Sequence, residues 1–349
     1  MNHNAIVANL TQVDDDIAFL QSSPSTQEIA FNLGETNIDF TNLNMDQFEG
    51  VLGSALWTVD YILYGASQNI NRMYLHQGTT FGYAAWQPIA TNTSQPKVRS
   101  PWYGLKFAAE AIGSHQGPIQ IVPLDFVVQS LPSNSTNSSS SSGVDTNANI
   151  TTPTATAINA NTTNPTATGT NPSGTTSSAD PHQLLTSEKI SAYGIYESSS
   201  LARIALINLN EWNATTPYPR PTALFKLALP RAGSASANGD VSARSAKKCT
   251  LRRANTGNGS EDANENEGDN GNDQGQGSGK VTIRKLTAPG GASADSDLTF
   301  GGIMWNYTTQ GLPQRVQGVP GTVEVDRLLQ DGSVLIELGA SEALLIDVA

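Results

Sequence analysis

The sequence predicts an α+β protein of more than one domain, in which alternating helices and strands precede an antiparallel β-sandwich. Three observations support this class. Apolar residues up to about residue 115 switch between helical and strand-like spacing, later ones form short strand-like runs, and two long polar stretches interrupt the later part. We therefore divide the chain into residues 1–115 and 116–349.

The first part alternates helices with strands. Ile6, Leu10 and Ile17 belong to an apolar stripe with spacings of three and four, which is typical of one face of a helix. Pro101 suits the first turn of another helix. The expected order is helix 4–21, strand 29–33, helix 49–68, strand 72–76 and helix 102–112. This order is typical of a barrel of strands and helices or of a doubly wound sheet.

The second part consists of short β-branched or alternating runs separated by Gly, Pro and Asn, which predicts a β-sandwich. Val281 and Ile283 alternate with polar neighbours, so one face of that strand is apolar. Cys249 and Leu251 alternate in the same way, which favours a buried strand residue over a reactive thiol at Cys249. The expected strands are 119–128, 192–196, 202–208, 223–228, 247–253, 281–286, 321–325, 334–338 and 343–348.

Two stretches of low complexity lie within the second part. Residues 131–182 are dominated by Ser, Thr, Asn, Ala and Pro, and residues 232–280 by Gly, Asn, Ser, Asp and Glu. Neither has enough apolar side chains to offset the entropy lost on ordering. Both are therefore predicted to be disordered insertions.

Composition excludes several functions. The formal net charge of −12 argues against a nucleic-acid partner, and the basic residues of 243–253 are best explained as a solvated strand face. With the single Cys249 and four scattered histidines, we expect no metal and no cofactor. We expect no signal peptide in this chain, because no basic segment followed by an apolar run opens it, and no membrane anchor, because no apolar window approaches the length of a membrane span. Several Asn-X-Ser/Thr acceptors give weak support for secretion.

Glu35 is the candidate catalytic residue. The apolar run of residues 29–33 ends at Gly34 and delivers Glu35 to the carboxyl end of a predicted parallel strand. Chemistry in a barrel of strands and helices is built at that rim, where a carboxylate suits a nucleophile or a proton-transfer group. The alternative is a solvated glutamate at a strand end.

A series of motifs resembles glycoside hydrolase family 79, the fungal β-glucuronidases related to heparanase. The matching runs in the first part are Leu-Gly-Glu-Thr-Asn at 33–37, Ser-Ala-Leu-Trp-Thr-Val-Asp-Tyr at 54–61, Leu-His-Gln-Gly at 75–78, Tyr-Ala-Ala-Trp-Gln-Pro at 83–88 and Ser-Pro-Trp-Tyr-Gly-Leu at 100–105. Those in the second part are Ser-Ala-Tyr-Gly-Ile-Tyr-Glu at 191–197, Ile-Asn-Leu-Asn at 207–210, Leu-Thr-Ala-Pro-Gly at 286–290 and Ser-Glu-Ala-Leu-Leu at 341–345.

The resemblance implies a retaining hydrolase built from a (β/α)₈ barrel and a C-terminal β-sandwich. Glu35 would be its nucleophile on strand seven, and residues 72–76 would be strand eight. The acid/base residue of the family lies on strand four, in an Asn-Glu-Pro-like motif that is absent from this sequence. The resemblance therefore implies that the chain is the C-terminal part of such an enzyme, with the last two barrel strands and three helices, and that it is inactive alone.

Four further residues are candidates for substrate binding. The resemblance places Gly82 and Tyr83 against the carboxylate of a uronic acid, whereas Tyr83 is otherwise a packed loop aromatic. Asn37 either holds the loop after Glu35 or forms a turn. His76 either hydrogen-bonds Glu35 or substrate, or is a satisfied structural histidine.

Other polar and aromatic residues have mainly structural interpretations. Trp86 and Trp102 could line a sugar subsite, although packing between loop and helix is the more usual use of such residues. Asp60 lies on a predicted helix and is interpreted as structural.

Two functions follow from these observations. The first is hydrolysis of β-linked glucuronic acid from a glycan by the full-length, secreted family member, with no nucleic acid, membrane or obligate protein partner. The second is a non-catalytic β-sandwich that persists as a carbohydrate-binding or structural remnant.

Overall fold

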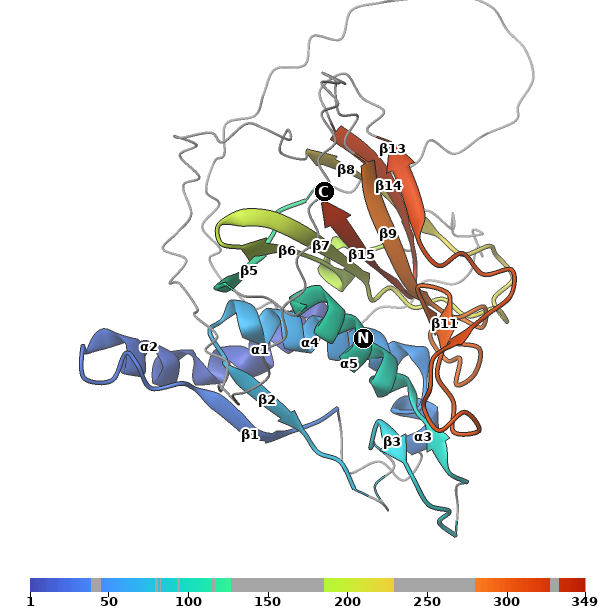
Figure 1. Cartoon of the computed structure of the whole chain (residues 1–349), viewed down its shortest axis with the longest axis horizontal. Helices are drawn as coiled ribbons and strands as arrows, with labels where there is room; N and C mark the ends of the chain where they lie inside the picture. The colour runs from blue at the N-terminus through green and yellow to red at the C-terminus, as the bar shows by residue number, and fades with distance from the viewer. Residues whose placement is uncertain are drawn as a thin grey trace, which may run out of the picture. The chain divides into compact units, whose positions relative to one another are not determined.

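The structure is a computed structural model that describes residues 1–38, 45–78, 81, 83–92, 95–113, 117–126, 185–228, 280–326 and 333–348. These residues belong to one compact unit that spans Met1–Leu131 and Pro181–Ala349 (Figure 1). Several expectations lie outside the described residues: the strand 247–253 with Cys249, the loop residue Gly82, and nearly all of both predicted insertions.

The N-terminal part contains helices, two parallel strands and a short hairpin. Its elements are α1 His3–Leu10, α2 Asp14–Ser22, β1 Asn32–Thr36, α3 Met45–Phe48, α4 Leu52–Ser67, β2 Arg72–Leu75, β3 Trp86–Gln87, β4 Lys97–Val98 and α5 Ser100–Ile112. The expected single helix over residues 4–21 is wrong, because a 3₁₀ turn at Thr11–Val13 separates α1 from α2.

The C-terminal part is rich in β-strands, as expected. Its strands are β5 Ile119–Pro123, β6 Ile190–Glu197, β7 Ser200–Asn208, β8 Thr222–Ala228, β9 Lys280–Thr287, β10 Thr299–Phe300, β11 Ile303–Met304, β12 Gln314–Arg315, β13 Val323–Asp326, β14 Ser333–Gly339 and β15 Glu342–Val348. Lys280, which we assigned to the second insertion, instead begins β9 and pairs with Asp326. The division at residue 115 falls between α5 and β5 and stays a prediction.

Most of these strands form one antiparallel sheet. Among the described residues it has nine strands in the order β12-β11-β10-β9-β15-β7-β6-β5, with β13 also paired to β9. Strands β8 and β14, which are far apart in the sequence, form a separate antiparallel sheet in which Thr222 pairs with Gly339 and Ala228 with Ser333. Figure 1 shows β15 and β9 running alongside each other in the larger sheet.

Both faces of the large sheet are buried, and successive residues of its central strands belong to different cores. Along β15, Ala343 and Leu345 contribute to a core with the helices, whereas Leu344 and Ile346 contribute to a core with β8 and β14. The period of two places alternate side chains on opposite faces of the sheet. The β8–β14 pair thus completes a sandwich, and helices α1, α4 and α5 cover the other face.

Helix α4 is buried nearly all round because it packs on both α5 and the sheet. Gly104 of α5 lies so close to α4 that a Cβ atom there would be 2.5 Å from the carbonyl oxygen of Ala55. The first amides of α4 are satisfied by the C-terminal part, because Leu52 N donates to Ala294 O at 2.7 Å and Gly53 N to Ala292 O at 2.9 Å. The two parts are therefore held together by backbone hydrogen bonds as well as by apolar contact.

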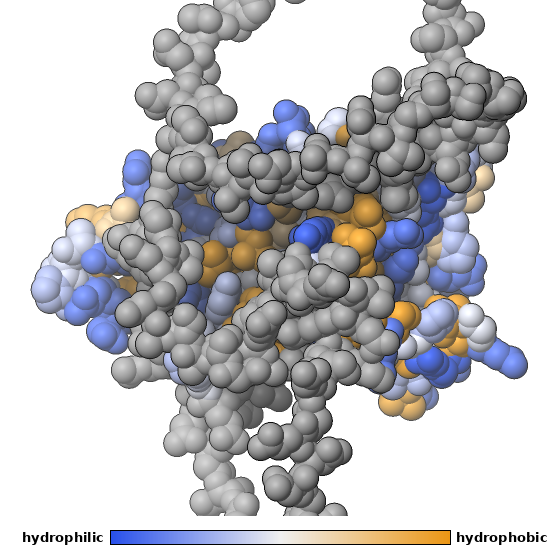
Figure 2. All heavy atoms as spheres, turned by 90° about the horizontal axis from the view of Figure 1, so that it is seen from above, coloured by the Kyte–Doolittle hydropathy of each residue, from blue (hydrophilic) through white to orange (hydrophobic). Residues whose placement is uncertain are grey.

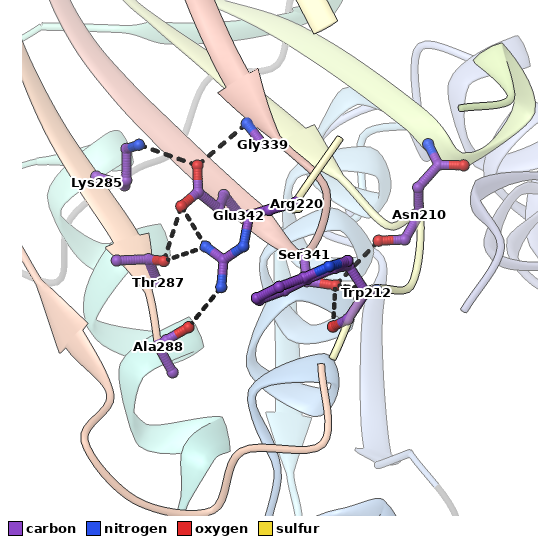
Figure 3. A network of polar contacts seen from close by, with 9 residues as sticks. All are labelled: Asn210, Trp212, Arg220, Lys285, Thr287, Ala288, Gly339, Ser341 and Glu342. Carbon is purple, nitrogen blue, oxygen red and sulfur yellow. Dashed lines mark hydrogen bonds and ion pairs between the residues drawn. The ribbon is translucent and has the colours of Figure 1, made fainter. Parts of the chain in front are cut away.

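A buried charge network fixes the start of β15 (Figure 3). Glu342 accepts from Arg220 Nη1 at 2.5 Å and from Lys285 Nζ at 3.0 Å, and its side chain is only 7% exposed. Burial alone would raise the pKa of Glu342, but Lys285 and Arg220 reverse the effect and hold this pKa below its ordinary value of 4.5. The guanidinium of Arg220 also lies 4.4 Å above the ring of Trp212.

Strands β1 and β2 form a two-stranded parallel sheet in which Asn32 pairs with Arg72 and Leu33 with Met73. The parallel pairing of the two strands agrees with the expectation. The expected start of the first strand and its expected burial are wrong. The strand begins at Asn32 instead of Ile29, and the Ile29 side chain is 54% exposed. Glu35 consequently lies inside β1, one residue before its end.

Candidate active site

Glu35 projects from β1 into solvent beside the end of β2. Its side chain is 73% exposed, and its Oε1 lies 3.6 Å from Nδ1 of His76. The parallel register explains this proximity, because Thr36 pairs with Leu75 and the amide of His76 donates to the carbonyl of Thr36 at 3.1 Å. The structure therefore brings together two of the residues that the sequence proposed, at the carboxyl ends of both strands.

His76 connects Glu35 to the loop that follows β2. Its Nδ1 lies 2.6 Å from the hydroxyl of Tyr83, and either atom is the donor according to the tautomer of His76. The ring also packs against Phe81 and Tyr83 at centroid distances of 4.7 and 5.5 Å. Among the described contacts of Nδ1, the shorter one goes to Tyr83 and the longer one to Glu35.

Tyr83 is a buried residue whose hydroxyl faces the histidine. The side chain is 5% exposed and stacks on Phe81 at 5.2 Å. Burial raises the pKa of Tyr83 above its ordinary value, and the charges of Glu35 and Glu49 raise this pKa further. The phenol therefore stays protonated at neutral pH and can donate a hydrogen bond.

Asn37 holds the backbone next to this group. Its Nδ2 donates to the carbonyl of His76 at 3.1 Å, and its Oδ1 accepts from the amide of Ile38 at 2.9 Å. The contacts fit the loop-holding role, because they join the residues that follow β1 to the end of β2. Thr36 adds a second connection, since its Oγ1 lies 2.7 Å from the hydroxyl of Tyr61 on α4.

Sequence reasoning missed Phe81, Glu49 and Tyr61. Phe81 stacks in the same group, although only its position near Tyr83 in the sequence pointed to it. Glu49 is fully buried and influences Tyr83 through its charge. No sequence pattern linked Glu49 to Tyr83, because 33 intervening residues separate them.

The other aromatic candidates lie elsewhere. Trp86 and Trp102 contact each other with a centroid distance of 5.9 Å, and Trp86 also approaches Tyr307 at 6.2 Å. Asp60 is fully buried and accepts from Tyr193, which agrees with its structural interpretation.

The described residues contain neither a cluster of metal ligands nor a helix that could span a membrane. No group of three or more His, Cys, Asp or Glu residues in that part of the chain could hold a metal ion. Within the same residues, no helix combines the length and apolar character needed to cross a membrane.

Figure 2 shows apolar residues beside hydrophilic ones on the visible part of one face.

Comparison with known proteins identifies the C-terminal part. Residues 192–345 match the profile described as "Glycosyl hydrolase family 79 C-terminal beta domain". The chain carries the C-terminal β domain of glycosyl hydrolase family 79. The match runs from most of β6 to part of β15, so it includes the β8–β14 pair and every strand of the large sheet except β5.

Two curated relatives are similar to this family 79 chain beyond that domain. A protein named β-glucuronidase from Aspergillus niger is 26% identical over 356 aligned positions, which cover 100% of this chain and 47% of the relative. A β-glucuronidase from Neurospora crassa is 28% identical and covers 57% of this chain and 29% of the relative. The chain spans less than half the length of each.

A solved structure supports the fold. It is described as a 4-O-α-L-rhamnosyl-β-D-glucuronidase from Fusarium oxysporum in a Rha-GlcA complex, with a TM-score of 0.55 at 17% identity. The similarity covers 100% of this family 79 chain and 49% of that protein. At this level of identity the likeness shows a shared fold.

Proposed function

We propose that this family 79 chain is the C-terminal portion of a retaining β-glucuronidase and that Glu35 is its nucleophile. The observation that carries the proposal is the placement of an exposed carboxylate at the carboxyl end of β1, 3.6 Å from His76. The names of the two curated relatives support the substrate class. In this role Glu35 attacks the anomeric carbon of a β-linked glucuronic acid, and the bond to the leaving oxygen breaks.

The neighbouring residues have supporting roles in this proposal. His76 positions both Glu35 and the hydroxyl of Tyr83 through the same ring atom, Nδ1. The protonated phenol of Tyr83, with the backbone at Gly82, binds the carboxylate of the sugar, because a donor is required for an anionic group. Asn37 keeps the ends of β1 and β2 in register through its bond to the carbonyl of His76.

In this proposal β1 and β2 are strands seven and eight of a (β/α)₈ barrel. The described residues pair these two strands only with each other. A retaining enzyme needs a second carboxyl group at roughly 5–5.5 Å, which first protonates the leaving oxygen and then activates water. We propose that the acid/base carboxyl group belongs to the part of the relatives that this chain does not span. A secreted, full-length protein would then contain both that group and Glu35.

General acid catalysis typically contributes about 10² to 10⁴ in rate, so the chain alone should hydrolyse a methyl β-D-glucuronide, whose leaving alkoxide needs a proton, at close to the background rate. Any turnover above background should disappear in Glu35→Gln and persist in Glu28→Gln, a matched change at an exposed residue of the preceding loop. Turnover that survives Glu35→Gln in a purified, folded protein would contradict the assignment.

A further inference from the structure

A cleft lies between α5 and the large sheet, away from the residues of the candidate active site. It encloses about 430 Å³, which is within the range of small-molecule sites. Neither Glu35, His76 nor Tyr83 lines it. The lining residues are Trp102, Lys106, Glu110, Arg284, Phe300, Gly301, Ile303, Trp305 and Pro313.

One wall of the cleft is helical. Trp102, Lys106 and Glu110 follow at intervals of four residues on α5 and therefore share one face of the helix. Lys106 Nζ lies 2.9 Å from Glu110 Oε1, so the two charged groups are fixed relative to each other. The indole Nε1 of Trp102 has no hydrogen-bond acceptor among the described residues.

The opposite wall is aromatic and fixed by tertiary contacts. The amide of Trp305 donates to the hydroxyl of Tyr103 at 3.0 Å, and that hydroxyl lies 2.9 Å from the carbonyl of Trp305. Phe300 packs against Phe107 at 5.0 Å. The turn between β10 and β11 uses Gly301 at φ +56°, a left-handed conformation that side chains disfavour. This wall is therefore preorganised.

A rim of balanced charge surrounds these aromatic rings. Arg284 forms an ion pair with Glu110 and a second one with Asp347 at 3.1 Å. The side chains of Lys106, Glu110 and Arg284 are 38%, 27% and 24% exposed, so each can still reach a ligand. Both lining cations are already paired with the carboxylate of Glu110, and Arg284 is paired with Asp347 as well, which does not favour a strongly anionic ligand.

Flat apolar rings beside fixed donors and acceptors suit a molecule with one apolar face and an edge of hydroxyl groups. We propose that this cleft is a second, non-catalytic binding site for a neutral pyranose unit of a glycan. The ring stacks on Trp102, and its hydroxyls bind Glu110, Lys106 and Arg284. Binding here goes beyond the proposed hydrolysis and does not depend on Glu35.

The test uses the full chain and methyl β-D-glucopyranoside as the probe, followed through the indole N–H signals of its five tryptophans by NMR. The Trp102 signal, assigned by its loss in Trp102→Phe, should shift in a saturable manner, and the Trp57 signal should not. Glycerol, which has hydroxyls but no ring, should cause no saturable shift. Glu110→Gln and Lys106→Met should each weaken binding about tenfold, which corresponds to about 1.4 kcal/mol.

Matched control variants distinguish binding in this cleft from binding at the candidate active site. Glu188→Gln at an exposed residue and Glu35→Gln at the candidate active site should both bind the probe as the unmodified chain does. The proposal is overturned if the probe shifts no indole signal, if Glu110→Gln and Lys106→Met bind normally, or if Glu35→Gln abolishes the shift. Because Lys106 and Glu110 are partly exposed, Lys106→Met and Glu110→Gln should fold. They therefore test the proposal even if Trp102→Phe does not fold.

Discussion

Replacing Asp60 by Asn should destabilise the fold, because this buried carboxylate joins three elements. Its Oδ1 accepts from the hydroxyl of Tyr193 on β6 at 2.5 Å, and its Oδ2 lies 2.9 Å from Nδ1 of His3 on α1. Asp60 itself is on α4 and is fully buried. An asparagine can accept one of these two bonds, but it presents an amide N–H₂ group to the other partner.

The expected loss is one charge-assisted hydrogen bond, which is about 1.5–3 kcal/mol in the free energy of unfolding. Urea unfolding followed by circular dichroism measures it as a lower midpoint at an unchanged slope. Asp295→Asn, at an exposed residue, is the matched control and should change the free energy of unfolding by less than about 0.5 kcal/mol. Equal midpoints for Asp60→Asn and Asp295→Asn would refute the assigned role.

Three further predictions concern the charge network, the helix contact and the candidate active site. Since the pKa of Glu342 is lowered in the folded state, its contribution to stability is present above its unfolded pKa and is lost as the pH falls through the folded value. The difference in melting temperature between the unmodified chain and Glu342→Gln should therefore shrink from pH 7 to pH 3, and a constant difference would contradict this. Gly104→Ala should cost about 1–3 kcal/mol in urea unfolding because its Cβ would meet Ala55, whereas Gly34→Ala, with nothing within 4 Å, should be nearly neutral. His76→Ala should slow the covalent labelling of Glu35 by a 2-deoxy-2-fluoro-β-glucuronyl fluoride about ten- to hundredfold, because Glu35 is no longer held in position. An unchanged labelling rate would exclude a positioning role for His76.

The large sheet was predictable because its central strands are continuous short apolar runs. In β7 and β15, successive apolar residues face two different cores, so the runs are unmistakable in the sequence. The strands β10, β11 and β12 were not predicted. Each has only two residues, and their pairing depends on intervening turns such as the one at Gly301 and Gly302, which leave no periodic signal.

In the N-terminal helical segment the apolar spacing correctly predicted the buried residues but not the break between α1 and α2. Ile6, Leu10 and Ile17 are all buried, as their spacing predicted. Thr11 nevertheless interrupts the helix, because its hydroxyl donates to the carbonyls of Val7 and Ala8 at 2.9 and 3.0 Å. A second helix begins at Asp14, whose acidic neighbours suit a helix N-terminus.

The positions of the candidate site residues at strand ends were predictable, but most of their contacts were not. Glu35 and His76 follow from strand ends, and their proximity follows from parallel pairing. The apolar run from Ile29 was misleading, because Ile29 is exposed and the hydrogen bonding with β2 starts at Asn32. The contact between His76 and Tyr83 depends on a loop fold that no periodicity encodes.

The Glu35 carboxylate is proposed to bond with the anomeric carbon of a glucuronic acid. A 2-deoxy-2-fluoro-β-glucuronyl fluoride tests it most directly, because fluoride departs without an acid and the sugar ester then accumulates on the nucleophile. Peptide mapping by mass spectrometry should find one sugar on the peptide that contains Glu35, in the unmodified chain and in Glu28→Gln but not in Glu35→Gln. A chain that remains unlabelled, or that is labelled at another residue or in Glu35→Gln, would contradict the assignment of Glu35 as the nucleophile.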